Sequence, residues 1–187
     1  MKISDIIIRK VKEINKRKPP QRFDWNDSLF EDLHFLSIDE RGQLGEEIAV
    51  DILKSFNCEV EYEPSVTRKN KGWDLISDNL KIEVKLATVT VGTGYFQHES
   101  MESKRDFDAI LFIDITPDEV YLTAVLKKDI NWKEMHKRKY GKDVFKCDFS
   151  IDQIKNNKII KFNNYKTGLV SSAQDFFDIY KWLEENK

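Results

Sequence analysis

The sequence predicts an α/β fold in which a β-sheet is flanked by helices, and three observations carry this prediction. Residues 40–56 have the apolar spacing of an amphipathic helix. Residues 73–77 and 80–87 alternate between apolar and polar side chains, as strands with one buried face do. Residues 107–115 and 119–126 are two further segments of strand-like composition. The chain therefore contains both helix and strand signals, as an α/β fold requires, and it has no internal repeat.

The first 38 residues contain one predicted helix and one aromatic segment. Residues 3–18 show helical spacing and end at Pro19-Pro20, which stops a helix. The apolar positions of this helix are Ile3, Ile7, Val11 and Ile14. Residues 21–38 are rich in aromatic and leucine side chains, so we expect an irregular or partly helical segment that packs on the core.

The helix at 40–56 is the clearest element of the sequence. Six small or apolar residues form one stripe on its helical wheel, and they are Gly45, Ile48, Ala49, Ile52, Leu53 and Phe56. Asn57 ends the helix, and the alternation at 59–62 predicts a short strand. The next two strands, 73–77 and 80–87, are separated by the turn-forming pair Asp78-Asn79.

The second half of the chain continues this alternation of elements. Residues 92–106 are polar, with a break at Gly92-Thr93-Gly94, and we expect a helix after the break. Strands at 107–115 and 119–126 are joined by a turn at Thr116-Pro117-Asp118. The C-terminal part is expected to hold a strand at 158–162 and a helix at 172–185.

The composition fits one soluble globular domain. The chain has 187 residues, of which 40% are hydrophobic and 34% charged. No apolar run approaches the roughly 20 residues that span a bilayer. We expect no secretory signal at the N-terminus, because its short apolar run is followed at once by Arg9 and Lys10. Cys58 and Cys147 are far apart and have no metal-ligand spacing, so we expect free thiols in the cytoplasm.

Positive charge is concentrated in two stretches, although the formal net charge is only −2. Residues 9–22 hold seven basic side chains and one acidic one, and residues 127–142 hold seven basic and two acidic ones. Two basic stretches on an otherwise acidic protein are what a phosphate-contacting surface requires. Lysine-rich segments are also often just solvated faces, and that reading stays open for each stretch.

Residues 72–85 bring three chemically active side chains together. If Asp78-Asn79 is a two-residue hairpin loop, Asp74 lies opposite Glu83, and Lys85 lies on the same face. The other face then carries only apolar side chains, namely Trp73, Leu75, Ile82, Val84 and Leu86. Opposed carboxylates repel one another, so this face favours a divalent cation between them. A mixed-charge strand face that is merely solvated is the alternative, and a one-residue slip would move Asp74 to the wrong face.

At these residues the sequence resembles the PD-(D/E)xK nuclease superfamily, the restriction-endonuclease-like fold. The family's first acid corresponds to Asp74, and its acid-x-lysine to Glu83-Val84-Lys85; Trp73 stands where the family usually has proline. The resemblance implies a central mixed β-sheet flanked by helices. Many members also carry a glutamate on the preceding helix, and Glu46 corresponds to it because it lies at the edge of the apolar stripe.

The resemblance covers about residues 40–126, which we expect to be the core of a single nuclease domain over 1–187. The helical segment 1–39 and the extension 127–187 have no counterpart in the resemblance. It implies that Asp74, Glu83, the Val84 carbonyl and Glu46 hold Mg²⁺ or Mn²⁺. Lys85 would orient or help deprotonate the attacking water and stabilise the transition state, and Asp74, Glu83, Lys85 and Glu46 together would be the catalytic set.

Contacts with double-stranded DNA are expected from the segment 88–106 and from the second basic stretch. The candidate side chains are Gln97, Arg105, Lys133, Lys137, Arg138 and Lys139. His98 could act as a base, but a single histidine without a partner more often has a structural role. His34 and His136 lack ligand spacing, which argues against zinc.

Among nucleases of this kind, the chain looks most like a small type II restriction endonuclease, which would act as a homodimer on palindromic sites. A structure-selective or repair nuclease of the same fold is the nearest alternative. A nucleic-acid-binding module that does not cut, and an enzyme or interaction protein unrelated to nucleic acid, are the other two hypotheses. A steep loss of DNA affinity with added salt would count against the last of these.

Overall fold

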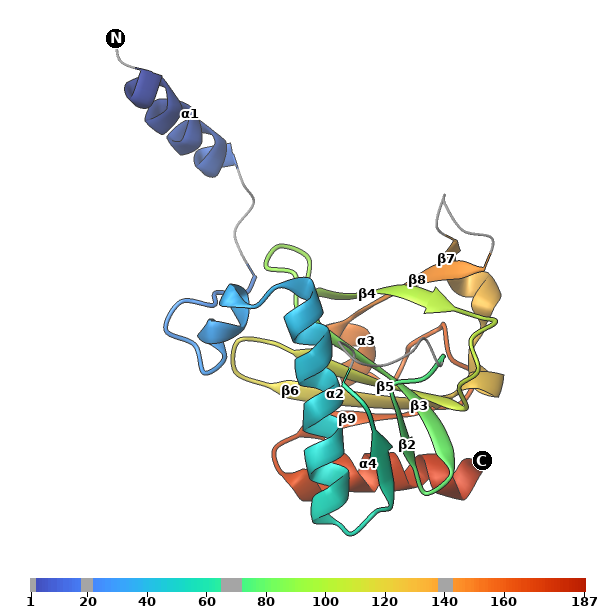
Figure 1. Ribbon diagram of the computed structural model, residues 1–187. Helices are drawn as coiled ribbons and strands as arrows, with labels where there is room; N and C mark the ends of the chain where they lie inside the picture. The colour runs from blue at the N-terminus through green and yellow to red at the C-terminus, as the bar shows by residue number, and fades with distance from the viewer. Residues whose placement is uncertain (1–2, 18–21, 65–71, 138–142) are drawn as a thin grey trace.

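A computed structural model describes residues 3–17, 22–64, 72–137 and 143–187 of the chain (Figure 1). Its α-helices are α1 (Ile3–Arg17), α2 (Ile38–Ser55), α3 (Ile151–Lys155) and α4 (Ala173–Asn186). Its strands are β1 (Val60–Tyr62), β2 (Leu75–Ser77), β3 (Leu80–Thr88), β4 (Tyr95–Glu102), β5 (Ala109–Ile115), β6 (Val120–Leu126), β7 (His136–Lys137), β8 (Val144–Ser150) and β9 (Lys166–Val170). Short 3₁₀ helices are η1 (Glu31–Phe35), η2 (Lys127–Asp129) and η3 (Trp132–Glu134).

The central sheet has six strands in the order β1-β2-β3-β5-β6-β9. The pair β3–β5 is parallel, whereas the other pairs are antiparallel, so the sheet is mixed. Strand β5 lies near the middle of the sheet and is buried along its whole length, as expected for a strand that is covered on both faces. A second sheet of three strands has the order β4-β8-β7.

The two faces of the central sheet are covered differently. Helix α2 packs on the face that carries Val84 and Leu86, where Gly45 lets the helix come close: a Cβ there would lie 2.9 Å from the Leu86 Cβ. Helix α4 lies against β6 and β9 and contacts α2. On the opposite face the small sheet packs against β5 through His98 and Phe112, whose ring centroids are 4.6 Å apart. The prediction of a mixed sheet flanked by helices is confirmed.

Two predicted elements are wrong. The expected helix within 92–106 is strand β4, which alternates between exposed and buried residues from Tyr95 to His98. A register shift between His98 and Met101, with Ser100 at a φ of 58°, then interrupts this period. The expected strand at 158–162 is a turn that makes one isolated bridge between Phe162 and Ile130. The last strand of the central sheet is β9 instead.

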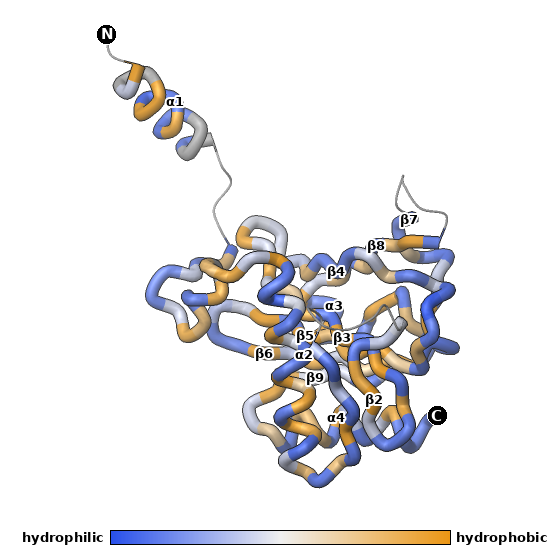
Figure 2. The backbone as a smooth tube through the Cα atoms, viewed as in Figure 1, coloured by the Kyte–Doolittle hydropathy of each residue, from blue (hydrophilic) through white to orange (hydrophobic). Residues whose placement is uncertain are grey.

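Helix α1 lies apart from the rest of the chain (Figure 1). Hydrophobic and hydrophilic segments alternate along it (Figure 2), and Ile3, Ile7, Ile8 and Val11 are exposed. Since η2, η3 and β7 occupy much of the second basic stretch, that stretch is not a continuous helix. None of the described helices combines the length and the apolar character that crossing a membrane requires.

Candidate active site

The β2–β3 hairpin has the register that the sequence predicts. Leu75 pairs with Ile82, and Ser77 pairs with Leu80. The two loop residues, Asp78 and Asn79, have φ values of 47° and 64°, which are the left-handed values that a type I′ turn needs at both positions. The hairpin therefore carries Glu83 and Lys85 on the face opposite the one that α2 covers.

Asp74 ends the pairing between the two strands of the hairpin. Its N–H donates to the Ile82 carbonyl at 2.9 Å, and its carboxylate Oδ2 accepts from the Val84 N–H at 2.7 Å. The side chain thus takes the place of a main-chain partner at the edge of β3. The N–H and C=O of one strand residue point to the same side, so the Val84 carbonyl faces this edge too.

Glu83 is buried and is held by two cations. The Lys85 Nζ lies 2.6 Å from its Oε1, and the Arg105 Nη1 donates to Oε1 at 2.9 Å and to Oε2 at 3.2 Å. The Glu83 side chain is 3% exposed, against 19% for Lys85 and 27% for Arg105. A buried carboxylate needs such partners, and here two side chains of the protein supply the positive charge.

These groups line one cleft of about 660 Å³. Its lining includes six consecutive residues of β3, from Glu83 to Thr88. Successive strand residues face opposite sides, so the cleft follows the edge of the strand. That edge is accessible because β2 pairs with β3 only over Leu80–Ile82 within the described part of the chain. Asp74, Glu83 and Lys85 all lie in this cleft.

Glu46 reaches the same cleft from α2. It is 6% exposed, whereas its neighbour Glu47 is exposed and accepts a hydrogen bond from Gln43 at 2.7 Å. Ser37 begins the helix with a capping box that involves Glu40. The structure therefore brings together all four side chains that the sequence singled out, with Glu46 on the helix and the other three on the hairpin.

The donor set suits a hard divalent cation that keeps part of its water shell. Asp74 and the Val84 carbonyl face the strand edge, and Glu83 adds a second carboxylate beside it. Among the described residues, no three His, Cys, Asp or Glu side chains are arranged as a complete metal site. Magnesium does not need one, because it is commonly held by one or two carboxylates, waters and a substrate phosphate. The residues present thus fit such an ion.

The positive charge beside Glu83 has a different source from the one predicted from the sequence. From the sequence, two opposed carboxylates favour a divalent cation between them, but in the structure Lys85 and Arg105 already supply positive charge to Glu83. The Arg105 contact had no local signal, because the two residues are 22 positions apart and belong to separate elements. Arg105 is one of the candidate DNA contacts predicted from the sequence; in this structure its guanidinium lies on Glu83.

His98 is one of the residues that line the cleft, and it lies between the two sheets. Its side chain is fully buried, and the His98 Nε2 lies 2.9 Å from the Asp114 Oδ1. Although the two atoms are close, their geometry is not that of a hydrogen bond. Phe112 and Phe149 pack on the imidazole. Burial raises the pKa of the Asp114 carboxyl, and the imidazole opposes this shift. The pair is a buried polar contact between the layers.

The remaining DNA-contact candidates are distributed unevenly. Gln97 is exposed on β4 and lines the cleft. Lys133 in η3 and Lys137 in β7 are exposed, and neither lines this cleft. Arg138 and Lys139 lie outside the described residues. Of the predicted DNA contacts that the structure describes, Gln97 and Arg105 line the cleft, and Gln97 is the neutral one.

No protein-family model matches the sequence, and a search of curated proteins gave no match. Among solved structures, the chain is similar to a bacterial homing endonuclease at 14% identity and a TM-score of 0.37, over 58% of this chain and 84% of that one. At these values the similarity defines neither the fold nor the activity of this chain.

Proposed function

We propose that this protein is a magnesium-dependent endonuclease that hydrolyses phosphodiester bonds in DNA. The observation that carries the proposal is the convergence of Asp74, Glu83 and Lys85 in one cleft at the edge of β3. Two carboxylates with an adjacent lysine are the chemistry that a metal-assisted attack on a phosphate needs. The resemblance of these residues to the PD-(D/E)xK motif supports the same conclusion.

Asp74, Glu83 and the Val84 carbonyl would hold Mg²⁺ or Mn²⁺, with Glu46 binding directly or through water. When bound, the ion would stabilise charge on the scissile phosphate and lower the pKa of a bound water. Lys85 would turn its ammonium group toward that water and the developing negative charge, because it lies on the same strand face as Glu83.

Arg105 would play a second part in the cleft. Its guanidinium neutralises Glu83 in this structure, and a cation bound at Glu83 would make that contact redundant. Arg105 would then be available for a phosphate, which guanidinium groups bind well through paired hydrogen bonds. The same side chain would thus protect the buried carboxylate before substrate arrives and contact the DNA backbone afterwards.

The finer assignment is a type II restriction endonuclease acting as a homodimer on duplex DNA. A two-fold symmetric protein matches the symmetry of a palindromic site. A structure-selective or repair nuclease on the same fold is the alternative within this class. The two differ in products: fixed fragments from restriction, and cuts at junctions, flaps or lesions from the alternative.

The test is digestion of unmethylated phage DNA, with Mg²⁺ or with EDTA, alongside branched and single-stranded substrates. Discrete bands that require Mg²⁺ are the expected result. A Mg²⁺-dependent smear, or cutting confined to branched DNA, would keep the chemistry and replace the restriction assignment. If no substrate is cut while salt-sensitive DNA binding persists, the protein is a binding module and the proposal is wrong.

A further inference from the structure

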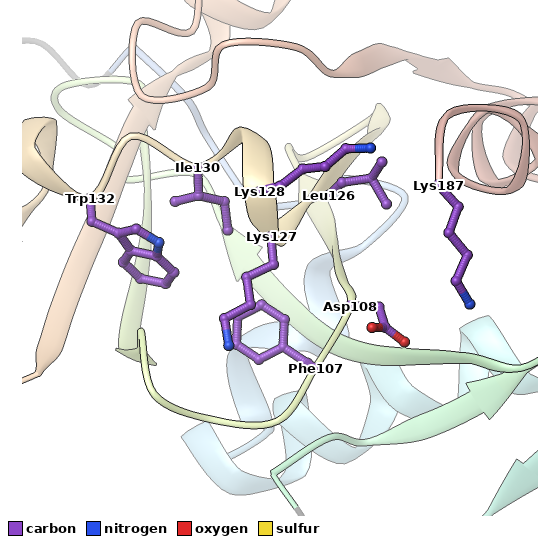
Figure 3. A pocket seen from close by; sticks show the side chains of 8 residues that line it. All are labelled: Phe107, Asp108, Leu126, Lys127, Lys128, Ile130, Trp132 and Lys187. Carbon is purple, nitrogen blue, oxygen red and sulfur yellow. The ribbon is translucent and has the colours of Figure 1, made fainter.

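A second cleft, of about 570 Å³, adjoins the segment that carries Arg105. The chain between β4 and β5 contributes to both clefts: Arg105 lines the first, whereas Phe107 and Asp108 line the second. The C-terminal end of β6, η2 and η3 form the rest of the second cleft, together with Lys187 (Figure 3). Two residues of extended chain span at most about 7 Å, so the clefts are neighbours.

In the described part of the chain, no carboxylate directly neutralises the positive charge that lines the second cleft. Lys127 donates to the Arg105 carbonyl, Lys128 to the Asn186 carbonyl at 2.8 Å, and Lys187 to the Asn79 carbonyl at 2.9 Å. Within the described residues, these three ammonium groups have main-chain partners and no ion pair. Among the described lining residues, Asp108 is the one acidic side chain, and its Oδ2 accepts from the Lys81 N–H at 3.0 Å.

Aromatic rings flank these charges. Figure 3 shows the rings of Trp132 and Phe107 with the Lys127 side chain reaching over Phe107. The Lys127 Nζ lies 4.7 Å from the Phe107 ring centroid, and Phe107 is buried. Trp132 is half-buried and packs against Phe145, at a centroid distance of 5.3 Å. A partly exposed indole beside uncompensated ammonium groups can stack on a planar group and bind an anion attached to it.

We propose that this cleft binds one unpaired nucleotide of a DNA strand, with its base on Trp132 and its two flanking phosphates at Lys127 and Lys128. Stacking on an aromatic ring combined with lysine–phosphate contact is how proteins bind single strands without reading sequence. The choice of DNA rests on the proposed function. A DNA strand that leaves the first cleft along the protein segment 103–108 would reach the second cleft next.

The contact between Lys127 and Arg105 gives the cleft a link to Glu83. The Lys127 ammonium holds the main chain of Arg105, and the side chain of Arg105 holds Glu83. A phosphate that draws Lys127 away would release this main-chain contact.

The experiment measures binding of a 12-residue oligothymidylate by tryptophan fluorescence in EDTA, where no cleavage occurs. Of the four tryptophans, Trp132 is the one in this cleft. We expect quenching that Trp132→Phe largely removes and Trp182→Phe retains. Trp132→Ala should weaken binding about 5- to 140-fold, which corresponds to about 1–3 kcal/mol per stacked base at about 1.4 kcal/mol per tenfold change.

Lys128→Gln is the second variant, because Lys128 is exposed and its only described contact is with the Asn186 carbonyl. It should lower the salt slope of log K by about 0.7, the value for one phosphate contact on a single strand. Lys158→Gln, an exposed control, should leave the slope unchanged. Circular dichroism verifies that each variant is folded.

Unchanged affinity and salt slope in both Trp132→Ala and Lys128→Gln would overturn the inference. Quenching by thymidine monophosphate but not by the oligonucleotide would also overturn it, since the cleft would then take a free nucleotide. Because binding is measured without Mg²⁺, the result is independent of cleavage. Binding without any DNA cleavage in Mg²⁺ would refute the proposed endonuclease and leave this cleft assigned.

Discussion

Replacing Arg105 by alanine distinguishes the two states that Glu83 is expected to adopt, one paired with Arg105 and one bound to a metal ion. Without a metal, the carboxylate depends on Lys85 and Arg105, and among the described cations the variant leaves it with Lys85 alone. With a cation bound at Glu83, the guanidinium is no longer needed there. The variant should therefore be less stable than the wild type in EDTA, and nearly as stable in saturating Mg²⁺.

The magnitude follows from the geometry of the contact. A hydrogen bond to a charged group contributes about 1.5–3 kcal/mol. Arg105 is 27% exposed, so solvent screening reduces the loss to about 1–2 kcal/mol. That loss lowers the Tm by about 2–8 °C in a chain of this size. Since the same energy opposes metal binding in the wild type, the variant should bind Mg²⁺ about 5- to 30-fold more tightly.

Thermal unfolding in EDTA and across a Mg²⁺ titration measures both quantities. Lys104→Ala is the matched control: it removes the neighbouring cation, which is 80% exposed and pairs with Asp143 at 2.7 Å. An exposed pair contributes little, and its loss should be equal in both conditions. If Arg105→Ala loses the same stability with and without Mg²⁺, or binds Mg²⁺ no more tightly than the wild type, the exchange at Glu83 is refuted.

Two further predictions concern the layers around the site. Gly45→Ala should lower the free energy of unfolding, measured by denaturant titration, by about 1–3 kcal/mol through overpacking, because the new Cβ would lie 2.9 Å from the Leu86 Cβ. The control Gly42→Ala, with nothing within 4 Å of its new Cβ, should be neutral or stabilising by up to about 1 kcal/mol. Equal losses of stability in the two variants would contradict the packing argument. Burial raises the pKa of Asp114, so its contribution to stability is full below the unfolded-state pKa and is lost as the pH rises through the folded-state pKa. Asp114→Asn should remove this loss of stability, which is followed by measuring the free energy of unfolding from pH 4 upward. An unchanged pH profile of stability would show that Asp114 does not cause the loss.

The hairpin could be predicted from the sequence because its signals are local. The pair Asp78-Asn79 fixes a two-residue loop, and the alternation on either side allows one register only if the apolar face is to be buried. Leu75 and Ile82 are paired as that register requires. The apolar stripe of α2 likewise distinguished Glu46, which is buried, from Glu47, which is exposed.

Strand β4 could not be predicted in the same way because its buried face is not purely apolar. His98 is one of its buried residues, and its partner Asp114 comes from β5, which only the tertiary structure brings near. The shift after His98 also breaks the period of two that identifies a strand. The sequence pattern therefore had neither an apolar alternation nor a constant period.

Long-range contacts explain the other differences. The ion pair of Arg105 with Glu83 joins residues on separate elements, and no spacing in the sequence connects them. Strand β9 contains Gly168, and its five residues are all exposed or half-buried, so the apolar residues at 158–162 were the stronger local signal. That segment is buried at Ile159 and Phe162 but lies in a turn, because burial alone does not distinguish a strand from packed irregular chain.

The measurement that tests the central claim most directly is single-turnover cleavage of DNA in Mg²⁺ by Asp74→Asn and Lys85→Met, each with a matched control. Asp51→Asn and Lys54→Met make the same changes at exposed positions on α2. We expect both site variants to be slower by at least about 100-fold, as for loss of a group that stabilises transition-state charge, while both controls cut at the wild-type rate. Folded site variants that cut as fast as the controls would show that the cleft at the edge of β3 is not the active site.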